Sequence, residues 1–318
     1  MSQHVAIVIV NWNGRSLLET CLPAALAQTY PHVEVIVVDN GSSDGSAEWV
    51  AARFPQVRLL CNSENAGFAA ANNLAFASTT APYLALLNND AAPEPGWLAA
   101  MVQAMESDTR VGSCAPQILR WDDHTVVDSQ GLSIDRTGTA WEWQSGQPVD
   151  RAASPEVREV FGASGAACLL RRAMLDDVGP FDDDFFAYLE DADLAWRARL
   201  AGWRCLYVPA AIVYHRHSAS SGEGSPFKGY HLGRNKCWMI AKNYPWPDLL
   251  WNLPLIVGRD VLAAAYHLLV RRDVHPLRGR LAAWRGMARA MRQRRVVQQR
   301  ATAAGKKAAR TLRHPLGL

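Results

Sequence analysis

The sequence predicts an α/β fold in which a mostly parallel sheet is flanked by helices. Apolar runs at residues 5–10 and 33–38 have the length of buried strands, and apolar residues at helical spacing lie between them. This strand–helix–strand order is typical of a parallel sheet. The chain has 318 residues, of which 49% are hydrophobic and 20% charged, so it can bury a sizeable core.

The first half of the chain continues the same alternation. The pattern predicts helices over 17–26, after the polar segment 42–46, and over 69–77, with further strands over 57–60 and 83–87. Each of these strands is followed by polar residues. In open α/β sheets, ligands bind beyond the carboxyl ends of the strands.

The second half is less regular. Residues 118–157 are rich in Gly, Asp and Trp, and we expect irregular strands and loops there. The pattern then predicts a strand over 166–170, a helix over 191–201, and short strands over 206–208 and 212–214. From residue 246 the chain is rich in Ala and Arg without strand signals. We therefore expect two units, residues 1–245 and a helical region, 246–318.

Charge and cysteine content narrow the class of protein. Residues 246–318 hold 15 Lys and Arg against 3 Asp and Glu, roughly +12, which leaves roughly −9 for residues 1–245. The six cysteines form no C-x-x-C pair, which argues against a zinc ribbon or a disulfide framework and fits a reducing cytosol. The apolar stretch 5–10 is too short for a signal sequence, so we expect a cytoplasmic location.

The first polar cluster combines residues 11–14, Asn-Trp-Asn-Gly, with residues 39–45, Asp-Asn-Gly-Ser-Ser-Asp-Gly. Small residues let a ligand approach the backbone, and a carboxylate at a strand end accepts hydrogen bonds from a base or a ribose. Turn formation and helix capping explain the same residues equally well. The spacing differs from G-x-G-x-x-G, so a dinucleotide site fits poorly.

The second cluster, Asn88-Asn89-Asp90, ends an apolar strand with one carboxylate. Mg²⁺ bound to a diphosphate needs only one or two protein carboxylates, because phosphate and water supply the other oxygens. Asp90 is therefore a candidate metal ligand. A simple turn before Pro93 is the alternative.

The third cluster is Glu190-Asp191-Ala192-Asp193, which follows an aromatic segment and opens a predicted helix. A hydroxyl group is a poor nucleophile, so an enzyme that transfers a group onto it needs a general base within hydrogen-bond reach. An acid at a helix N-terminus also caps the helix and is stabilised in its ionised form there. The two interpretations are compatible, because a base must be ionised before it acts.

Two further segments carry polar or small residues at strand ends. His215 follows the predicted strand 212–214, and a lone histidine is more often structural than a metal ligand. If His215 is a ligand, its imidazole is softer than the ligands that Mg²⁺ prefers, which points toward Mn²⁺ as well. The segment 161–165 allows close approach of a sugar or forms a packing bend. Residues 218–225 are predicted to form a mobile loop.

Three motifs in order resemble the opening of glycosyltransferase family two, especially its rhamnosyltransferase-like branch. They are V-I-V-N-W-N-G, V-I-V-V-D-N-G-S-S-D-G-S and N-A-G-F-A-A-A-N-N, and the resemblance extends over about residues 6–218. It implies a GT-A fold and metal-dependent, inverting transfer of a sugar from a nucleotide diphosphate donor. The region 246–318 is then a C-terminal helical appendage.

The resemblance also implies roles for individual residues. It places Asp39 against the base, makes Asp191 the catalytic base, and gives Mn²⁺ or Mg²⁺ the ligands Asp90 and His215. The family usually has D-x-D at the metal position, where Asn88 replaces the first acid. The expected nucleotide-binding residues are Val10, Asn11, Asn13, Asp39, Asn40, Asn65, Gly67, Asn72 and Asn89. Those expected to bind the acceptor or sugar, or to neutralise the departing diphosphate, are Ser164, Gly165, Glu190, Asp193, Arg216 and His217.

The branch resemblance points to deoxythymidine diphosphate rhamnose as donor, with galactofuranose or another hexose next, and to a polyprenyl-linked saccharide of a bacterial surface polymer as acceptor. Two other classes of protein fit these residues less well. A non-catalytic sugar-nucleotide-binding protein is expected to lose the base, yet Asp191 is present. A sugar-phosphate nucleotidyltransferase needs a Gly-rich basic loop after the first strand, and residues 11–15 supply one Gly and one Arg.

The basic C-terminal region predicts contact with a membrane surface. Residues 249–270 have the length of a membrane span, but Arg259 and Asp260 interrupt it, and central charges cost about 2.5–3.5 kcal/mol each. We therefore expect a peripheral helix on the inner face of the cell membrane. Nucleic-acid binding is not expected, because no stacking platform accompanies the charge. A homo-oligomer contact through these helices stays open.

Overall fold

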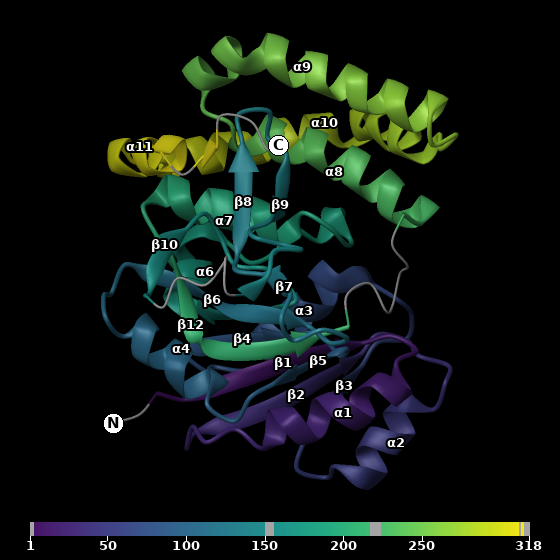
Figure 1. Cartoon of the computed structure of the whole chain (residues 1–318), viewed down its shortest axis with the longest axis vertical. Coiled ribbons are helices and arrows are strands. Elements are labelled where there is room, and N and C mark those ends of the chain that lie inside the picture. Colours follow the sequence, from purple (N-terminus) through teal and green to yellow (C-terminus); the bar gives the residue numbers. More distant parts are fainter. Residues whose placement is uncertain (1–2, 150–155, 217–223, 312, 315–318) are drawn as a thin grey trace.

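A computed structural model of the chain describes residues 3–149, 156–216, 224–311 and 313–314. It has an α/β half built around one large sheet and a layer of helices from the C-terminal quarter, which lies across the other end of the molecule (Figure 1). The predicted fold class, a central sheet flanked by helices with a C-terminal helical appendage, is confirmed.

The first half of the chain forms the parallel part of the sheet, with strand order β3-β2-β1-β4. Alternate residues of β1 enter two separate cores, one on each face of the sheet, which explains its uninterrupted apolar run. The elements are β1 (Val5–Asn11), α1 (Arg15–Leu26), β2 (Val33–Asp39), α2 (Ser46–Arg53), β3 (Arg58–Cys61), α3 (Gly67–Ser78) and β4 (Tyr83–Leu87).

The second half extends the sheet in the order β10-β12-β6-β11-β4, and β11 runs antiparallel to both of its neighbours. Its elements are β5 (Ala91–Pro93), α4 (Trp97–Met105), β6 (Val111–Arg120), β7 (Val127–Ser129), β10 (Arg158–Val160), β11 (Ala167–Arg171), α6 (Arg172–Val178), η1 (Asp183–Phe185), α7 (Glu190–Ala201) and β12 (Arg204–His215).

The two short strands predicted over 206–208 and 212–214 are parts of one strand, β12, so that division was wrong. The pairing of β12 with β6 shifts register between Val208 and Ile212. Pro209 lies within this irregularity, and a proline cannot donate to a sheet ladder. The break in the sequence pattern therefore marks a bulge inside the strand.

A small second sheet stands between the main sheet and the helical layer. It consists of β8 (Leu132–Asp135), β9 (Ala140–Glu142) and β13 (Arg313–His314). Its first two strands come from residues 118–157, where the sequence predicted only irregular strands and loops. These strands are short and bring side chains from this segment over the carboxyl ends of the parallel strands.

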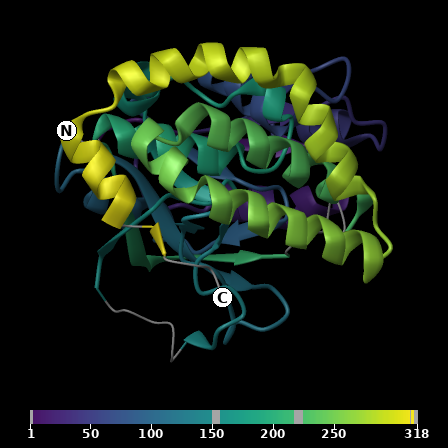
Figure 2. The ribbon, with the colours of Figure 1, turned by 90° about the horizontal axis from the view of Figure 1, so that it is seen from above.

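The C-terminal layer contains α8 (Pro226–Asn243), α9 (Trp246–Leu269), α10 (His275–Arg300) and α11 (Ala303–Thr311). Seen from above in Figure 2, these helices lie over part of the α/β half and leave strands and loops at one side uncovered. The layer begins with α8, which lies before the predicted boundary at residue 245 and packs along α10. Among the described residues, α9 is the one helix long and apolar enough to cross a membrane.

Glycines set the close approach of α8 and α10. A Cβ atom added at Gly279 would lie 2.0 Å from the main-chain oxygen of Tyr230, and one at Gly286 would lie 2.4 Å from the ring of Trp238. Such separations are far below van der Waals contact. The two helices can therefore pack at this distance only because these positions lack side chains.

We predict opposite effects for two helical Gly→Ala substitutions. Gly258→Ala on α9 meets open space and should raise the free energy of unfolding by up to about 1 kcal/mol, because alanine favours the helix. Gly279→Ala should lower it by about 1–3 kcal/mol through overpacking. Urea unfolding of both variants checks this, and a stabilised Gly279→Ala protein would contradict the packing described.

Candidate active site

A cavity of about 900 Å³ lies beyond the carboxyl ends of β1, β2 and β4. The second sheet and the first turns of α7 and α8 complete its walls. The predicted site residues that line it are Val10, Asn40, Asn65, Gly67, Asn89, Asp90, Ser164, Gly165, Glu190, Asp191 and His215. The structure thus brings together residues from every cluster that the sequence singled out.

Buried hydrogen bonds fix the strand ends at one end of the cavity. Asn11 is fully buried, donates from Nδ2 to Asp39 Oδ2 (3.3 Å) and accepts from Asn89 Nδ2 (2.8 Å). The other oxygen of Asp39 accepts from the main-chain N–H of Ser42 (2.9 Å). Asn11 and Asp39 are not among the lining residues, so they support this end of the cavity from beneath.

Asn40 holds the adjoining loop in place. Its Nδ2 donates to Asn65 Oδ1 (2.9 Å) and its Oδ1 accepts from the main-chain N–H of Ala66 (3.1 Å). The loop ends at Gly67, whose φ of +88° favours glycine. A Cβ atom there would lie 2.6 Å from the main-chain oxygen of Phe186, so this glycine also allows the segment before α7 to close the cavity wall.

The chemistry of the predicted metal ligands fits a divalent cation. His215 Nε2 lies 3.2 Å from Asp90 Oδ1, and its Nδ1 lies 2.7 Å from Asp128 Oδ2. A carboxylate on the second ring nitrogen is the arrangement that orients a metal-binding histidine. Among the described residues, no group of three or more His, Cys, Asp or Glu side chains is placed to hold a metal. Phosphate and water would therefore supply the remaining ligands.

The carboxylates beside His215 also favour positive charge on its imidazole ring. Burial lowers the pKa of its imidazole, but the carboxylates of Asp128 and Asp90 outweigh burial and raise the pKa to about 10. Asp128 was not predicted from the sequence, because it comes from β7 in the segment 118–157, which has no clear pattern. Only the antiparallel pairing of β7 with β6 brings it beside His215.

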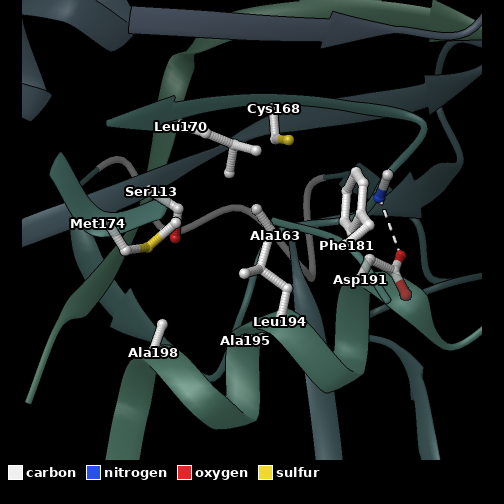
Figure 3. A pocket seen from close by; sticks show the side chains of 11 residues that line it. Ser113, Ala163, Cys168, Leu170, Met174, Phe181, Asp191, Leu194, Ala195 and Ala198 are labelled. Atoms are coloured by element: carbon white, nitrogen blue, oxygen red, sulfur yellow. Dashed lines mark hydrogen bonds between the residues drawn. The ribbon is translucent and has the colours of Figure 1, made fainter. Parts of the chain in front are cut away.

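Asp191 stands at the start of α7 with one side facing the cavity. Its Oδ2 accepts from the main-chain N–H of Gly165 (2.9 Å) and its Oδ1 from that of Ala192 (2.7 Å). Figure 3 shows the side chains behind it, including Phe181 and Leu194, around a small second cavity. Burial raises the pKa of Asp191, while these two hydrogen bonds oppose the rise. A carboxylate with a raised pKa suits a general base.

Two more carboxyl groups lie in the same cavity. Burial, and then the charge of Asp191, raise the pKa of Glu190 well above its usual value. Glu142 on β9 accepts from Ser164 Oγ (2.9 Å) and Ser129 Oγ (2.5 Å). Burial and the charge of Asp191 raise the pKa of Glu142 to about 7. Glu142 was not predicted from the sequence.

Three further predicted residues lie away from the cavity lining. Asn13 is exposed, and its side-chain oxygen accepts a hydrogen bond from the main-chain N–H of Ser43. Asn72 is buried in α3, where it donates to the main-chain oxygen of Phe68. Arg216 is exposed, with its guanidinium over Trp121. Their predicted contacts with nucleotide or substrate find no support in these positions. His217 and most of the segment 218–225 lie outside the described residues.

Asp193 requires a correction. It was expected to orient the acceptor, but its side chain is fully buried and pairs with Arg197 (2.9 Å) and Lys242 (2.9 Å). Burial opposes ionisation, yet these two cations lower the pKa of Asp193 below its usual value. Asp193 follows Asp191 by two positions on a helix and so points to a different face. It joins α7 to α8 instead of contacting the acceptor.

The structure adds lining residues that the sequence did not single out as binding residues. They are aromatic or basic side chains from separate elements: Trp12, Trp141, Phe186, Tyr188, Phe227 and Lys228. Lys228 is the one lysine or arginine among the described lining residues. No periodicity distinguishes such side chains from ordinary surface residues, and only the assembled fold reveals their common cavity.

Comparison with known proteins agrees with this geometry. Residues 6–179 match the family described as Glycosyl transferase family 2, and the chain belongs to this family. It is 30% identical to an N-acetylglucosaminyl-diphospho-decaprenol L-rhamnosyltransferase of Mycobacterium tuberculosis, over 88% of this chain and 97% of the relative. Glycosyltransferase AglE of Haloferax volcanii is 29% identical over 84% of this chain and 80% of its own length.

Solved structures share the fold. A mannosyltransferase from Pyrobaculum calidifontis in complex with GDP-Man and Mn²⁺ matches 97% of this chain and 87% of its own, with a TM-score of 0.55 and 20% identity. GalNAc-T7 with UDP, GalNAc and Mn²⁺ matches 76% of this chain and 48% of its own, with a TM-score of 0.60 and 16% identity. At these identities the likeness concerns the fold alone.

We predict that Glu142→Gln changes stability in a pH-dependent way. Because folding raises the pKa of Glu142 from 4.5 to about 7, the native state favours the protonated acid. Its contribution is complete below pH 4.5 and is lost as pH rises through about 7. The variant should therefore gain stability relative to wild type between pH 5 and pH 8 in urea unfolding. A difference independent of pH would contradict the buried, Asp191-coupled setting of Glu142.

Proposed function

We propose that this chain is an inverting glycosyltransferase that moves rhamnose from deoxythymidine diphosphate rhamnose to a hydroxyl group of a polyprenyl-diphosphate-linked saccharide. The observation that carries the proposal is the placement of Asp191 and the Asp90–His215 pair in one cavity at the strand ends. Family membership and the acceptor named for the mycobacterial relative support the reaction class and the substrates.

Asp191 acts as general base in this reaction. As the acceptor oxygen forms a bond to the anomeric carbon, its proton passes to the Asp191 carboxylate. The bond between that carbon and the donor phosphate oxygen breaks, and the electron pair leaves with the nucleoside diphosphate. Attack from the face opposite the leaving group inverts the anomeric centre. Gly165 and Ala192 hold the carboxylate in position through their N–H groups.

Asp90 and His215 would hold the divalent cation, and Asp128 orients the imidazole. When bound, such a cation neutralises the charge that develops on the departing diphosphate. An imidazole ligand favours Mn²⁺ over Mg²⁺. Val10, Asn40 and Asn65 line the neighbouring end of the cavity, where the nucleoside would lie above the buried Asn11–Asp39 network.

The acceptor would enter along the wall formed by α8. Phe227, Lys228 and Leu232 place a cation beside apolar side chains on this wall. That combination suits a phosphate group joined to a lipid. The remaining walls carry several carboxyl groups, so Lys228 is the side chain best placed to offset a phosphate charge there.

The exposed face of α9 supports attachment to a membrane surface. Trp251, Leu262 and Leu269 are 85%, 73% and 74% exposed, and Arg271 and Arg272 follow directly in the chain. Large exposed apolar side chains beside arginines are typical of helices that lie in the interface of an anionic membrane. This fits an enzyme whose acceptor is anchored in the membrane.

The opposite face of α9 is tied to the protein. Asp260 pairs with Lys236 on α8 (2.9 Å), and Asn252 accepts from Arg136 Nε (3.0 Å). These contacts hold α9 along the body of the fold. A helix attached in this way lies on the membrane more readily than it crosses it, so we propose a cytoplasmic, peripheral location.

Sugar transfer tests the proposed function. Wild-type protein with Mn²⁺, a panel of sugar nucleotides and a lipid-linked acceptor should turn over one donor, and EDTA should abolish turnover. Asp191→Asn should lower kcat by about 10²–10⁴-fold while the nucleoside diphosphate still binds. Asp176→Asn, an exposed acid on α6, is the matched control and should retain full activity.

A thermal-shift measurement separates this enzyme class from nucleotidyltransferases. A nucleoside diphosphate with Mn²⁺ should raise the Tm of the wild type, because a ligand that binds the native state stabilises it. Asp90→Asn should lose that effect. Stabilisation by a nucleoside triphosphate alone, with no sugar transfer from any donor, would refute the proposal.

Vesicle sedimentation tests the membrane surface. Combined Trp251→Glu and Leu262→Glu substitutions should lower affinity for anionic phospholipid vesicles by at least about tenfold, since burial of a large apolar side chain contributes about 1.5–3 kcal/mol. Ala51→Glu with Ala52→Glu on exposed positions of α2 makes the same change in net charge. Equal loss in both double variants would show that only net charge matters and would contradict a role for α9.

A further inference from the structure

The segment between η1 and α7 has an unusual backbone. Phe186, Tyr188 and Leu189 have φ angles of 63°, 69° and 67°, in the left-handed region that side chains disfavour. Each such residue costs of order 1–3 kcal/mol unless the surrounding structure holds it. Leu189 is directly followed by Glu190 and Asp191. The direction in which α7 presents its first acids therefore depends on this segment.

Asn235 of α8 binds this segment through its main chain. Its side chain is fully buried, and Nδ2 lies within hydrogen-bonding distance of three carbonyl oxygens, those of Phe185 (3.0 Å), Ala187 (2.9 Å) and Tyr188 (2.7 Å). A helix side chain that donates to a run of neighbouring carbonyl groups fixes their orientation. Asn235 thus satisfies oxygens that the left-handed backbone turns away from any helix or strand partner.

Neighbouring polar residues of α8 extend these contacts. Arg234 Nη2 donates to two main-chain oxygens at the start of the segment, both at 2.9 Å, and its Nε donates to Asn235 Oδ1 at 2.9 Å. Two turns further along α8, Lys242 pairs with Asp182 (2.7 Å) and Asp193 (2.9 Å), which flank the segment on either side. One helix therefore contacts the segment itself and both of its ends.

The other side of the segment rests on α3. The main-chain N–H of Ala69 donates to the oxygen of Phe186 (3.2 Å), and Gly67 leaves room for that residue. The segment is held between the N-terminus of α3, which lies at the donor end of the cavity, and α8. Phe186 and Tyr188 meanwhile line the cavity.

We propose that Asn235 is a positioning residue for catalysis: its contacts with the carbonyl groups of residues 185, 187 and 188 set the left-handed segment that aims Asp191 into the cavity. Asn235 touches neither substrate nor metal ligand in this role. The C-terminal helical layer is then part of the catalytic machinery, because α8 is fixed in turn by its glycine-lined packing against α10. This inference depends on the proposed function only for its activity readout.

Asn235→Asp tests the inference. It keeps the size of the side chain but places a carboxylate against three carbonyl oxygens. We expect kcat to fall by about 10–100-fold, the range produced by small misplacement of a catalytic group. The KM for the donor and the affinity for a nucleoside diphosphate with Mn²⁺ should change less than threefold, since the donor end of the cavity is untouched.

The matched control is Asn252→Asp. Asn252 is also a buried asparagine, and its Nδ2 donates to one carbonyl oxygen, that of Asp248 (2.7 Å). It should leave kcat unchanged. The acid limb of the kcat pH profile gives a second readout: burial raises the pKa of Asp191, so a loosened segment should shift that limb to lower pH in Asn235→Asp only.

Hydrogen–deuterium exchange tests the segment without any activity. Peptides covering residues 183–191 should exchange faster in Asn235→Asp than in wild type or Asn252→Asp. If the Asn235→Asp variant fails to fold, the Arg234→Lys variant is tested in its place and should show the same changes to a smaller extent. A kcat equal to that of the control, or unchanged exchange in these peptides, overturns the inference. If the wild type transfers no sugar but the exchange result holds, the proposed function fails, and only the support that Asn235 gives to the segment before α7 stands.

Discussion

Five carboxyl groups share one cavity in this protein, and much of the structure serves to hold them there. Asp90, Asp128, Glu142, Glu190 and Asp191 come from four separate segments, and burial together with the charge of Asp191 raises the pKa of Glu142 and of Glu190. Hydrogen bonds from serine hydroxyls and main-chain N–H groups, together with one imidazole, offset part of this repulsion. The result is an acidic cavity that suits the proposed binding of a cation and the proposed removal of a proton from the acceptor.

Different elements carry the residues proposed to bind the donor and the residue proposed to act as base. The parallel strands β1, β2 and β4 supply the rigid edge on which a nucleotide and a metal can be held, and their polar ends are locked by amide networks. The proposed base, Asp191, is carried by a helix that follows a segment with left-handed backbone, and α8 supports this segment.

The C-terminal helices join the site to the surface that we propose contacts a membrane. α8 contributes Phe227 and Lys228 to the cavity wall, holds the segment before Asp191, and packs on α10. α9 is bound to α8 through Lys236 and Asp260 and exposes its apolar face. The helical layer is therefore continuous with the active site, although its amino-acid composition differs sharply from that of the α/β half.

The sequence by itself determined the alternation of strands and helices, the family, and those site residues that belong to local motifs. Asp90, Asp191 and His215 were predicted because each follows a strand or starts a helix, and because the family resemblance implied a role for each of them. Only the tertiary structure revealed Asp128 and Glu142, the aromatic side chains that line the cavity, and the proposed role of Asn235. These side chains act through neighbours that are remote in sequence, as Asn235 does across about 50 residues. Asp193 shows the converse: its place in the acidic motif looked functional, but helix geometry turns it into the interior, where Arg197 and Lys242 bind it.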